Sequence, residues 1–425
     1  MPSAIYERLH EHIFEIHIID THEHIPDEAV AIGRKKSLFS FFEHYVSSDL
    51  VSAGMPRESL ETMRDETNSL SLADRWDLMA PYWPYARTTG YGRAFTGYMH
   101  DLFGIVDINE DSYQELSARI ASAQRPGWHR EVLRDRARID KAIVTTWPGE
   151  PVRSDRGLLL SSPIFDHYAT VSTRAELQAL EKEAGQSIQT LPQLMQAQEA
   201  GLDRMVKGGA VAVKIFLAYQ RPLLFEPVEQ AQASRVFDRI WLSQPRDLKF
   251  EDVKPLQDFM TRRLVGLAAE RGLPIQIHTG MQEGNGNHLT NARPTLLTNL
   301  FLDFPDARFD VFHAGYPYWR ETAVLAKYFA NVYADLAWLH AISPRAAATI
   351  LDEWLEIIPS NKILGVGGDS NYVEGAYGHT QTARRITCDV LAAKVETGGL
   401  SIDEAQWLAT RILRENAIEA LRLNV

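Results

Sequence analysis

The sequence predicts an α/β barrel of the (β/α)8 TIM type, in which eight parallel strands are each followed by a helix, with a large helical insertion after the first strand. Short, mostly β-branched apolar runs recur between longer amphipathic segments, as buried parallel strands alternate with helices. Barrels of this kind hold more than about 400 residues in one domain when they carry insertions. The chain has 425 residues without an internal repeat or clear linker, so we expect residues 1–425 to form one domain.

Eight apolar runs are the predicted strands. They are residues 16–20, 141–146, 158–165, 210–217, 274–278, 308–313, 331–336 and 362–369. Amphipathic segments that end in Gly, Asn or Pro lie between the later runs and are the predicted helices. They include residues 253–271, 294–304, 320–329 and 343–358.

Residues 25–138 depart from this alternation. The segment is too long for one helical crossover and is rich in helix-forming and aromatic residues, so we interpret it as a helical insertion. Because it follows the carboxyl end of the first strand, it would lie over the mouth of the barrel, where barrel enzymes have their sites. It could serve there as a lid or substrate wall, or its aromatic residues could pack a small core or a subunit interface.

Composition limits the classes of function. The chain carries 44 Lys and Arg against 56 Asp and Glu, a net charge of -12, which argues against nucleic-acid binding. Its only cysteine, Cys388, excludes an intrachain disulfide and any cysteine-based metal cluster. The amino-terminal residues lack the pattern of a secretion signal and no apolar run is long enough to span a bilayer. We therefore expect a cytoplasmic protein with no membrane or nucleic-acid partner.

A metal-binding pattern follows the first predicted strand, where the sequence reads Asp20-Thr-His22-Glu-His24. In extended backbone, residues i and i+2 point the same way, so His22 and His24 can offer two imidazoles to one metal ion. On their own, the two histidines could equally be ordinary, partly buried side chains.

Three other predicted strands also end in a residue that can bind a metal. These residues are His278, His313 and Asp369. In a barrel the carboxyl ends of the strands converge on one mouth, so these groups would meet the first-strand histidines there. Imidazoles with a carboxylate suit Zn²⁺, Mn²⁺ or Fe²⁺ better than Ca²⁺. A bound ion would activate water for attack on an amide, ester or lactone, with Asp369 as general base, or polarise a carbonyl for isomerisation or decarboxylation.

These motifs resemble the amidohydrolase superfamily, in its amidohydrolase-related branch. The resemblance rests on Asp20-Thr-His22-Glu-His24, His278-Thr-Gly280, His313-Ala-Gly315 and Gly367-Gly-Asp369-Ser370. Residues 214–221 and 313–335 are most similar to the amidohydrolase-like domain fused to glutamine-synthetase-like proteins. Uronate isomerases and aminocarboxymuconate-semialdehyde decarboxylase are more distantly similar. The resemblance implies that His22, His24, His278 and Asp369 bind metal, and that His313 binds a second metal or acts in catalysis.

The resemblance gives Lys214 three alternative roles. In the binuclear hydrolases of the superfamily a lysine of the fourth strand is carboxylated and bridges two metals, whereas isomerases and decarboxylases lack that bridge. Lys214 could form the bridge, contact the substrate or be structural. Four residues just past strand ends are expected to bind substrate, namely Tyr219, Arg221, Trp338 and His340. Arg221 could hold a carboxylate through two hydrogen bonds, or face only water.

The sequence therefore predicts a metal-dependent hydrolase that attacks an amide or lactone carbonyl of a small organic acid. Asp369, His313 and Lys214 are its expected catalytic residues. One or two divalent ions per chain are expected, zinc first and manganese or iron as alternatives. A decarboxylase or uronate-type isomerase is the second hypothesis, and a non-catalytic binding domain is the third. The expected partners are a small-molecule substrate and further copies of the chain in a homo-oligomer.

Overall fold

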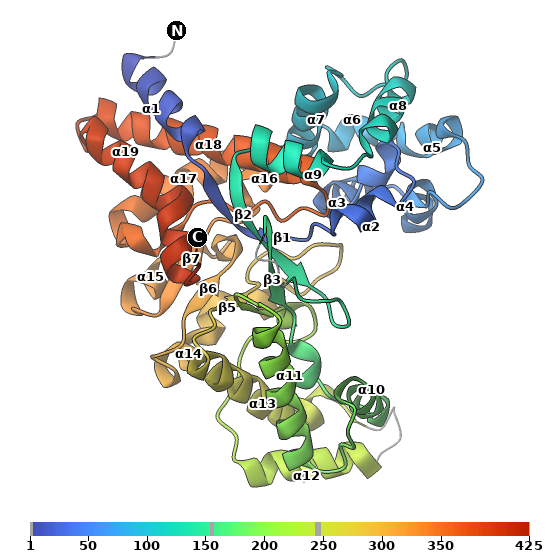
Figure 1. The fold of residues 1–425 in the computed structure, drawn as a ribbon, viewed down its shortest axis with the longest axis vertical. Helices are drawn as coiled ribbons and strands as arrows, with labels where there is room; N and C mark the ends of the chain where they lie inside the picture. Colours follow the sequence, from blue (N-terminus) through green and yellow to red (C-terminus); the bar gives the residue numbers. More distant parts are fainter. Residues whose placement is uncertain (1–2, 154–156, 243–247, 425) are drawn as a thin grey trace.

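Eight parallel strands form the centre of the molecule (Figure 1). The structure is a computed structural model that describes residues 3–153, 157–242 and 248–424. One sheet has the order β1(Ile18–Glu23)-β2(Ile139–Thr146)-β3(Leu159–Pro163). The other has the order β4(Val213–Ile215)-β5(Ile275–Ile277)-β6(Phe309–Val311)-β7(Val332–Asp335)-β8(Ile363–Leu364). Every pair of neighbours is parallel, so all eight carboxyl ends lie on one side.

The ring of strands is not closed by regular pairing. Among the described residues only individual backbone hydrogen bonds cross the two gaps, such as Val211 N to Ser161 O (3.0 Å) and Thr21 N to Val366 O (3.0 Å). The sequence predicts a regular strand through residues 362–369, yet β8 ends at Leu364. A Cβ atom on Gly365 would lie 2.2 Å from Ile412, so this glycine segment is packed too closely for side chains.

Every predicted apolar run overlaps a strand, and six of the eight strands are shorter than the runs that contain them. The first strand is shifted toward the carboxyl end and includes His22. Four helices match predicted segments. They are α13(Phe250–Glu270), α14(Thr298–Asp303) after the short turn η6(Pro294–Leu297), α15(Trp319–Tyr328) and α17(Pro344–Ile357).

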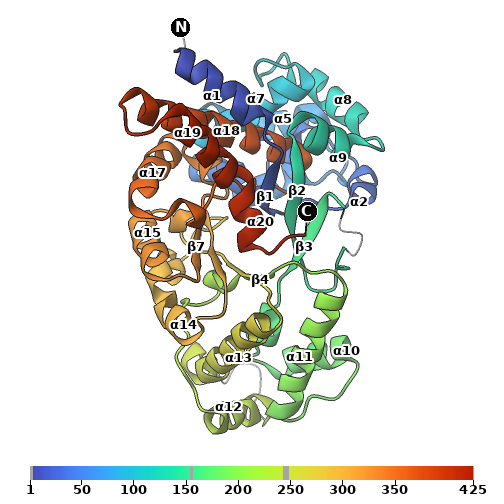
Figure 2. The ribbon, with the colours of Figure 1, turned by 60° about the vertical axis from the view of Figure 1, so that its left-hand side comes forward.

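Local capping explains where several helices begin and end. In α10(Arg174–Ala184), Thr173 accepts a hydrogen bond from Glu176 N, and Gly185 ends the helix with a φ of 65°. The other crossover helices are α11(Leu191–Lys207), α12(Gln230–Leu242) and α16(Leu339–Ile342). After β8 come α18(Val373–Glu396), α19(Ile402–Thr410) and α20(Asn416–Ala420), and α1(Ala4–Glu15) packs beside α18 and α19 (Figure 2). None of the helices in the described part of the chain combines the length and hydropathy that a membrane span needs.

The segment between β1 and β2 is helical. It contains α2(Glu28–Ile32), η1(Leu38–Phe41), α3(His44–Ser52), α4(Arg57–Arg64), α5(Leu72–Met79), α6(Trp83–Ala86), α7(Gly90–Phe103), α8(Tyr113–Ala123), α9(Trp128–Arg130) and η2(Glu131–Arg136). Figure 1 shows these helices at one end of the molecule and α10 to α13 at the other. Aromatic rings fill the segment's interior, with Phe42 packed between Trp83 and Phe95. The Tyr98 hydroxyl meets that of Tyr372, just before α18, at 2.9 Å.

Candidate metal centre

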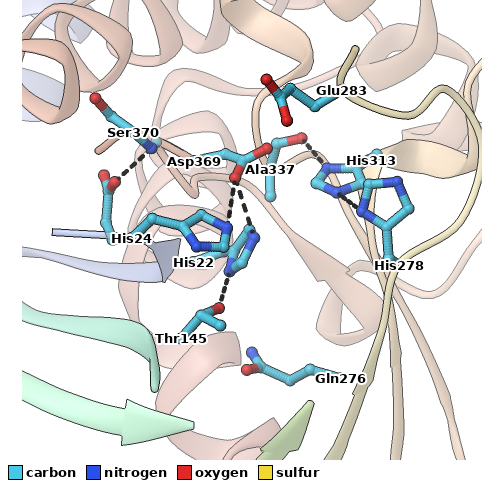
Figure 3. A network of polar contacts seen from close by, with 12 residues as sticks. His22, His24, Thr145, Gln276, His278, Glu283, His313, Ala337, Asp369 and Ser370 are labelled. Atoms are coloured by element: carbon cyan, nitrogen blue, oxygen red, sulfur yellow. Dashed lines mark hydrogen bonds and ion pairs between the residues drawn. The ribbon is translucent and has the colours of Figure 1, made fainter. Parts of the chain in front are cut away.

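The histidines of β1 converge on one carboxylate oxygen. The Nε2 atoms of His22 and His24 each lie 3.2 Å from Oδ1 of Asp369 (Figure 3). The three side chains are 2%, 8% and 5% exposed. Although two nitrogens lie close to it, Asp369 Oδ1 accepts no well-aligned hydrogen bond from the described residues. The lone pairs of the two Nε2 atoms and of Oδ1 thus surround a common point, which is the arrangement of ligands around a cation.

The loop that carries Asp369 is fixed by the two acidic residues of the same motif, Asp20 before the histidines and Glu23 between them. Asp20 accepts a hydrogen bond from Gly368 N at 3.2 Å, and Glu23 accepts one from Ser370 N at 2.7 Å. A Cβ atom on Gly368 would lie 2.0 Å from the Glu23 carboxylate, so only glycine fits there. In the Asp-Thr-His-Glu-His motif, the histidines thus offer ligands while Asp20 and Glu23 position the third ligand.

A second histidine pair adjoins this group. Nδ1 of His313 lies 3.1 Å from the Ala337 carbonyl, and Nε2 of His278 lies 3.2 Å from the Met281 carbonyl. Because a carbonyl only accepts, each ring must donate there, and each neutral ring then has no second proton. Yet His278 Nδ1 and His313 Nε2 face each other at 3.0 Å. Two lone pairs at that distance repel unless a proton or a cation lies beside them.

Burial sets the protonation of the group. Burial lowers the pKa of His24 and His22, the latter well below its usual value, and lowers that of His313 to about 4. Burial opposes ionisation of Asp369, but the adjacent histidines hold the pKa of its carboxyl well below the ordinary value. Neutral imidazoles beside an ionised carboxylate are the donor state that Zn²⁺, Mn²⁺ or Fe²⁺ binds. The residues therefore fit a divalent metal.

Two sets of three potential ligands share Asp369. One set is His22, His313 and Asp369, and the other is His24, His44 and Asp369; within each set all ligand atoms lie within 4.8 Å of one another. His44 begins α3 in the insertion, and the sequence analysis, which considered strand ends, missed it. The predicted ligand His278 belongs to neither set and contacts His313 instead.

Backbone strain is concentrated at this site. Seven non-glycine residues of the described chain have positive φ, and four of them are His44 (52°), His313 (64°), Trp338 (69°) and Asp369 (52°). Non-glycine residues seldom adopt this conformation because Cβ clashes with the backbone, and where they do the strain is held by the surrounding structure, often at functional sites.

A cavity of about 410 Å³ opens above the group. Its wall consists of His24, Glu43, His44, Arg64, Trp147, Phe216, Tyr219, His278, Glu283, Asp369 and Asn371. The insertion supplies three of these residues, Glu43, His44 and Arg64, so it forms part of the wall. Glu43, Arg64, Glu283 and Asn371 were not among the sequence candidates because no strand-end pattern marks them.

Comparison with known proteins agrees with this geometry. A family model described as amidohydrolase matches residues 202–423, just over half of the chain. This chain belongs to the amidohydrolase family. The superfamily predicted from the motifs is thereby confirmed.

Relatives of the amidohydrolase fall in two groups. Uronate isomerase of Nostoc punctiforme is 21% identical over 469 residues, covering 100% of this chain and 97% of that protein. Protein fluG of Emericella nidulans is 28% identical over 235 residues, 52% of this chain but only 27% of fluG. The crystal structure of uronate isomerase from Thermotoga maritima superposes with a TM-score of 0.79 at 16% identity, covering 99% and 98% of the two chains. The last comparison shows a shared fold over the full length.

Of the residues expected to bind substrate, only Tyr219 lines the cavity of this amidohydrolase. Its ring stacks on Phe216 at 4.2 Å, and its hydroxyl accepts a hydrogen bond from Glu283 N at 2.9 Å. Trp338 is buried behind the site, with its ring 5.3 Å from that of His313. His340 is also buried away from the cavity wall, and burial lowers its pKa to about 3.

Arg221 departs from its predicted role as a substrate ligand. Its guanidinium forms a buried ion pair with Asp258 and donates hydrogen bonds to Gln257 at 3.1 Å and to the Leu224 carbonyl at 3.0 Å. Both charged side chains are 1% exposed. The residue is absent from the cavity wall, and its donors are used inside the protein, so it is a structural arginine.

Lys214 is fully buried in the interior of the strand ring. Its Nζ lies 3.6 Å from the centroid of the Phe312 ring and has no hydrogen-bond partner among the described residues. Burial lowers its pKa to about 7, although nearby carboxylates, first Asp369 and then Asp310, oppose the shift. Lys214 is not part of the cavity wall, and its three alternative roles stay predictions.

Proposed function

We propose that this amidohydrolase is a metal-dependent isomerase that acts on the open-chain carbonyl of a sugar acid of the uronate type. The observation that carries the proposal is the match to uronate isomerases over essentially the whole chain, in sequence and in fold. The sequence analysis placed hydrolysis first and isomerisation second, and the comparisons favour the second hypothesis.

The metal would be held by His22, His24 and Asp369, with His313 or His44 completing the set. When bound, a divalent ion supplies a Lewis acid that polarises the substrate carbonyl. Zinc suits this donor set, and manganese and iron are the alternatives.

Isomerisation of an aldose to a ketose moves one proton from C2 to C1 and one from the C2 hydroxyl to the carbonyl oxygen on C1, and it therefore needs a group that can take up and return a proton. The His278 and His313 pair supports such a role, because its facing nitrogens, 3.0 Å apart, have room for one shared proton. Around the cavity, Phe216 and Tyr219 form a stacked aromatic wall that excludes water from the reacting carbons.

The test is a product analysis of the metal-loaded protein. We expect uronates such as D-glucuronate to be converted to the corresponding keto acid, followed by NMR in D₂O, and a panel of lactones and amides to remain intact. Hydrolysis of that panel without isomerisation, or release of carbon dioxide, would contradict the proposal and favour one of the other reactions.

Asp369→Asn supplies the matched variant. It removes the charge shared by both ligand sets while keeping the shape of the side chain. We expect metal content, measured by plasma mass spectrometry, to fall from about one equivalent to well below it, with loss of isomerase activity by at least about a hundredfold. Full metal content and activity in this variant would show that the metal lies elsewhere.

A further inference from the structure

A second cavity adjoins the metal cavity. It has a volume of about 480 Å³ and shares Glu43, Arg64 and Asn371 with the metal cavity. The rest of its wall comes from the insertion, together with Tyr372 directly before α18. These residues are Pro26, Ala31, Gly33, Arg34, Lys35, Lys36, Ser40, Phe41, Asp65, Glu66, Thr67 and Tyr372. Because the metal chemistry uses none of them, this cavity needs another explanation.

Two carboxylates of the second cavity, those of Glu66 and Asp65, accept hydrogen bonds from nearby serine and threonine residues. Glu66 accepts hydrogen bonds from Ser37 N at 3.1 Å and from the Ser40 hydroxyl at 2.7 Å. Asp65 accepts two from Thr67, from its amide at 2.9 Å and from its hydroxyl at 2.6 Å. Each of the two carboxylates thus has one oxygen engaged by neighbouring donors, while Glu66 Oε2 has no hydrogen-bond partner among the described residues.

The cations of the same wall are much less engaged. Arg34 is exposed and its side chain forms no hydrogen bond or ion pair with the described residues. Lys35 reaches Glu66 only at 4.0 Å, and Lys36 lies 5.7 Å from the Phe41 ring centroid. In a chain of net charge -12, a cavity wall with four basic residues whose donors are mostly free favours an anion.

Arg64 connects the two cavities. It ends α4 and lines both of them, with its side chain 34% exposed. Its contact with Glu43 Oε1 is 3.6 Å long, beyond hydrogen-bond length. The other oxygen of Glu43 accepts a hydrogen bond from Asn371 at 2.8 Å. The hydrogen-bond donors of the Arg64 guanidinium are therefore available to a ligand, and Arg64 belongs to the same cavity wall as Asp369.

We propose that Arg64, supported by Arg34, binds the anionic group at the end of the substrate distant from the metal. This inference rests on the proposed function, since it assigns the acidic end of the sugar acid whose carbonyl would lie at the metal. The guanidinium fork matches a carboxylate or a phosphate equally, so either group could occupy the subsite.

The test compares three non-reacting ligands by calorimetric titration of the metal-loaded, full-length protein. A hexonate has one terminal carboxylate, which would replace the substrate carbonyl at the metal and leave an uncharged end toward Arg64. A hexarate has a second carboxylate, and a 6-phosphohexonate a phosphate, at the end that would reach Arg64. We expect the preferred doubly charged ligand to bind about tenfold more tightly than the hexonate. Preference for the hexarate identifies a carboxylate subsite, and preference for the phosphohexonate identifies a phosphate subsite.

Two variants and one control assign the preference to residues. Arg64→Met should abolish the tenfold preference while leaving hexonate binding almost unchanged. Arg34→Met, at an exposed position where folding is not at risk, should reduce the preference about threefold. Arg57→Met is the control, because Arg57 begins the same helix, is exposed and is not part of either cavity wall. It should retain the full preference.

The outcomes separate this inference from the proposed function. Equal affinity for all three ligands, an Arg64→Met variant that weakens them all alike, or no binding at all would overturn the subsite. An Arg64-dependent preference without turnover of any uronate would leave the subsite standing and count against the isomerase. Turnover of uronates without any preference for the doubly charged ligands would support the isomerase and overturn the subsite.

Discussion

Individual residues of this protein separate into those that bind ligands and those that hold the binders in place. Asp20 precedes the two histidines and Glu23 lies between them, and both are fully buried with burial raising the pKa of each carboxyl. Their hydrogen bonds to the amides of Gly368 and Ser370 give the loop of Asp369 its position. The motif thus combines two functions, because His22 and His24 offer ligands while Asp20 and Glu23 position the loop of the third ligand.

The Arg221 and Asp258 pair allows a prediction about stability without catalysis. Arg221→Met should lower the free energy of unfolding by about 3 kcal/mol, because it leaves a buried carboxylate with fewer partners. The Michaelis constant for the substrate should stay unchanged. Urea unfolding and steady-state kinetics measure the two quantities.

Arg239→Met is the matched control for that experiment. Arg239 pairs with Asp252 at 3.1 Å, but the two side chains are 54% and 33% exposed. Removing this pair should cost less than about 1 kcal/mol. A raised Michaelis constant in Arg221→Met at unchanged stability would restore the substrate role that the sequence suggested.

At the scale of elements, the loop after β8 is the most demanding part of the site. Its glycines pack against β1 and β7, and its Asp369 has a φ of 52°. Gly367 faces Thr21 and Ala337, where a Cβ atom would lie within 2.8 Å of each side chain. The loop therefore packs tightly between the ends of β1 and β7, which explains why regular pairing of β8 stops early.

Gly368→Ala tests this close packing of the loop after β8. The added methyl group would meet the Glu23 carboxylate at 2.0 Å, so the loop must move and carry Asp369 with it. We expect metal affinity to fall by about tenfold or more, measured by competition with a chelator. Gly97→Ala in α7 is the control, because its methyl group meets no atom within 4 Å. It should instead stabilise the protein by about 0.5–1 kcal/mol. Unchanged metal affinity in Gly368→Ala would show that the loop adapts.

At the scale of the whole molecule, apolar periodicity was enough to predict the order of the strands along the chain, since each predicted run overlaps one. The metal-binding group could be predicted for the same reason, because His22, His313 and Asp369 follow such runs. His44 and Arg64 could not be predicted from the sequence, since they lie in an insertion whose position over the barrel depends on long-range packing. Arg221 was misplaced because its partner, Asp258, is 37 residues away and lies on another helix.

The polar interior of the strand ring predicts how global stability depends on pH. Burial raises the pKa of Asp166 from 3.8 to about 7, while its Oδ2 accepts a hydrogen bond from Phe216 N. Between about pH 4 and pH 7 the folded chain keeps a proton that the unfolded chain has released, so this carboxyl lowers stability as pH rises through that range. Asp166→Asn keeps the acceptor and removes the titration.

The difference in stability between Asp166→Asn and the parent chain should therefore be pH-dependent. Below about pH 4 the carboxyl is protonated in both states and the two proteins should unfold alike. By pH 8 the variant should be the more stable, by at most about 4 kcal/mol. Urea unfolding at a series of pH values measures this difference, with the exposed Asp111→Asn as a control that should show no such trend. A constant difference at all pH values would mean that Asp166 is ionised in the folded protein, with the charge of Lys214, its one cationic neighbour among the described residues, balancing it.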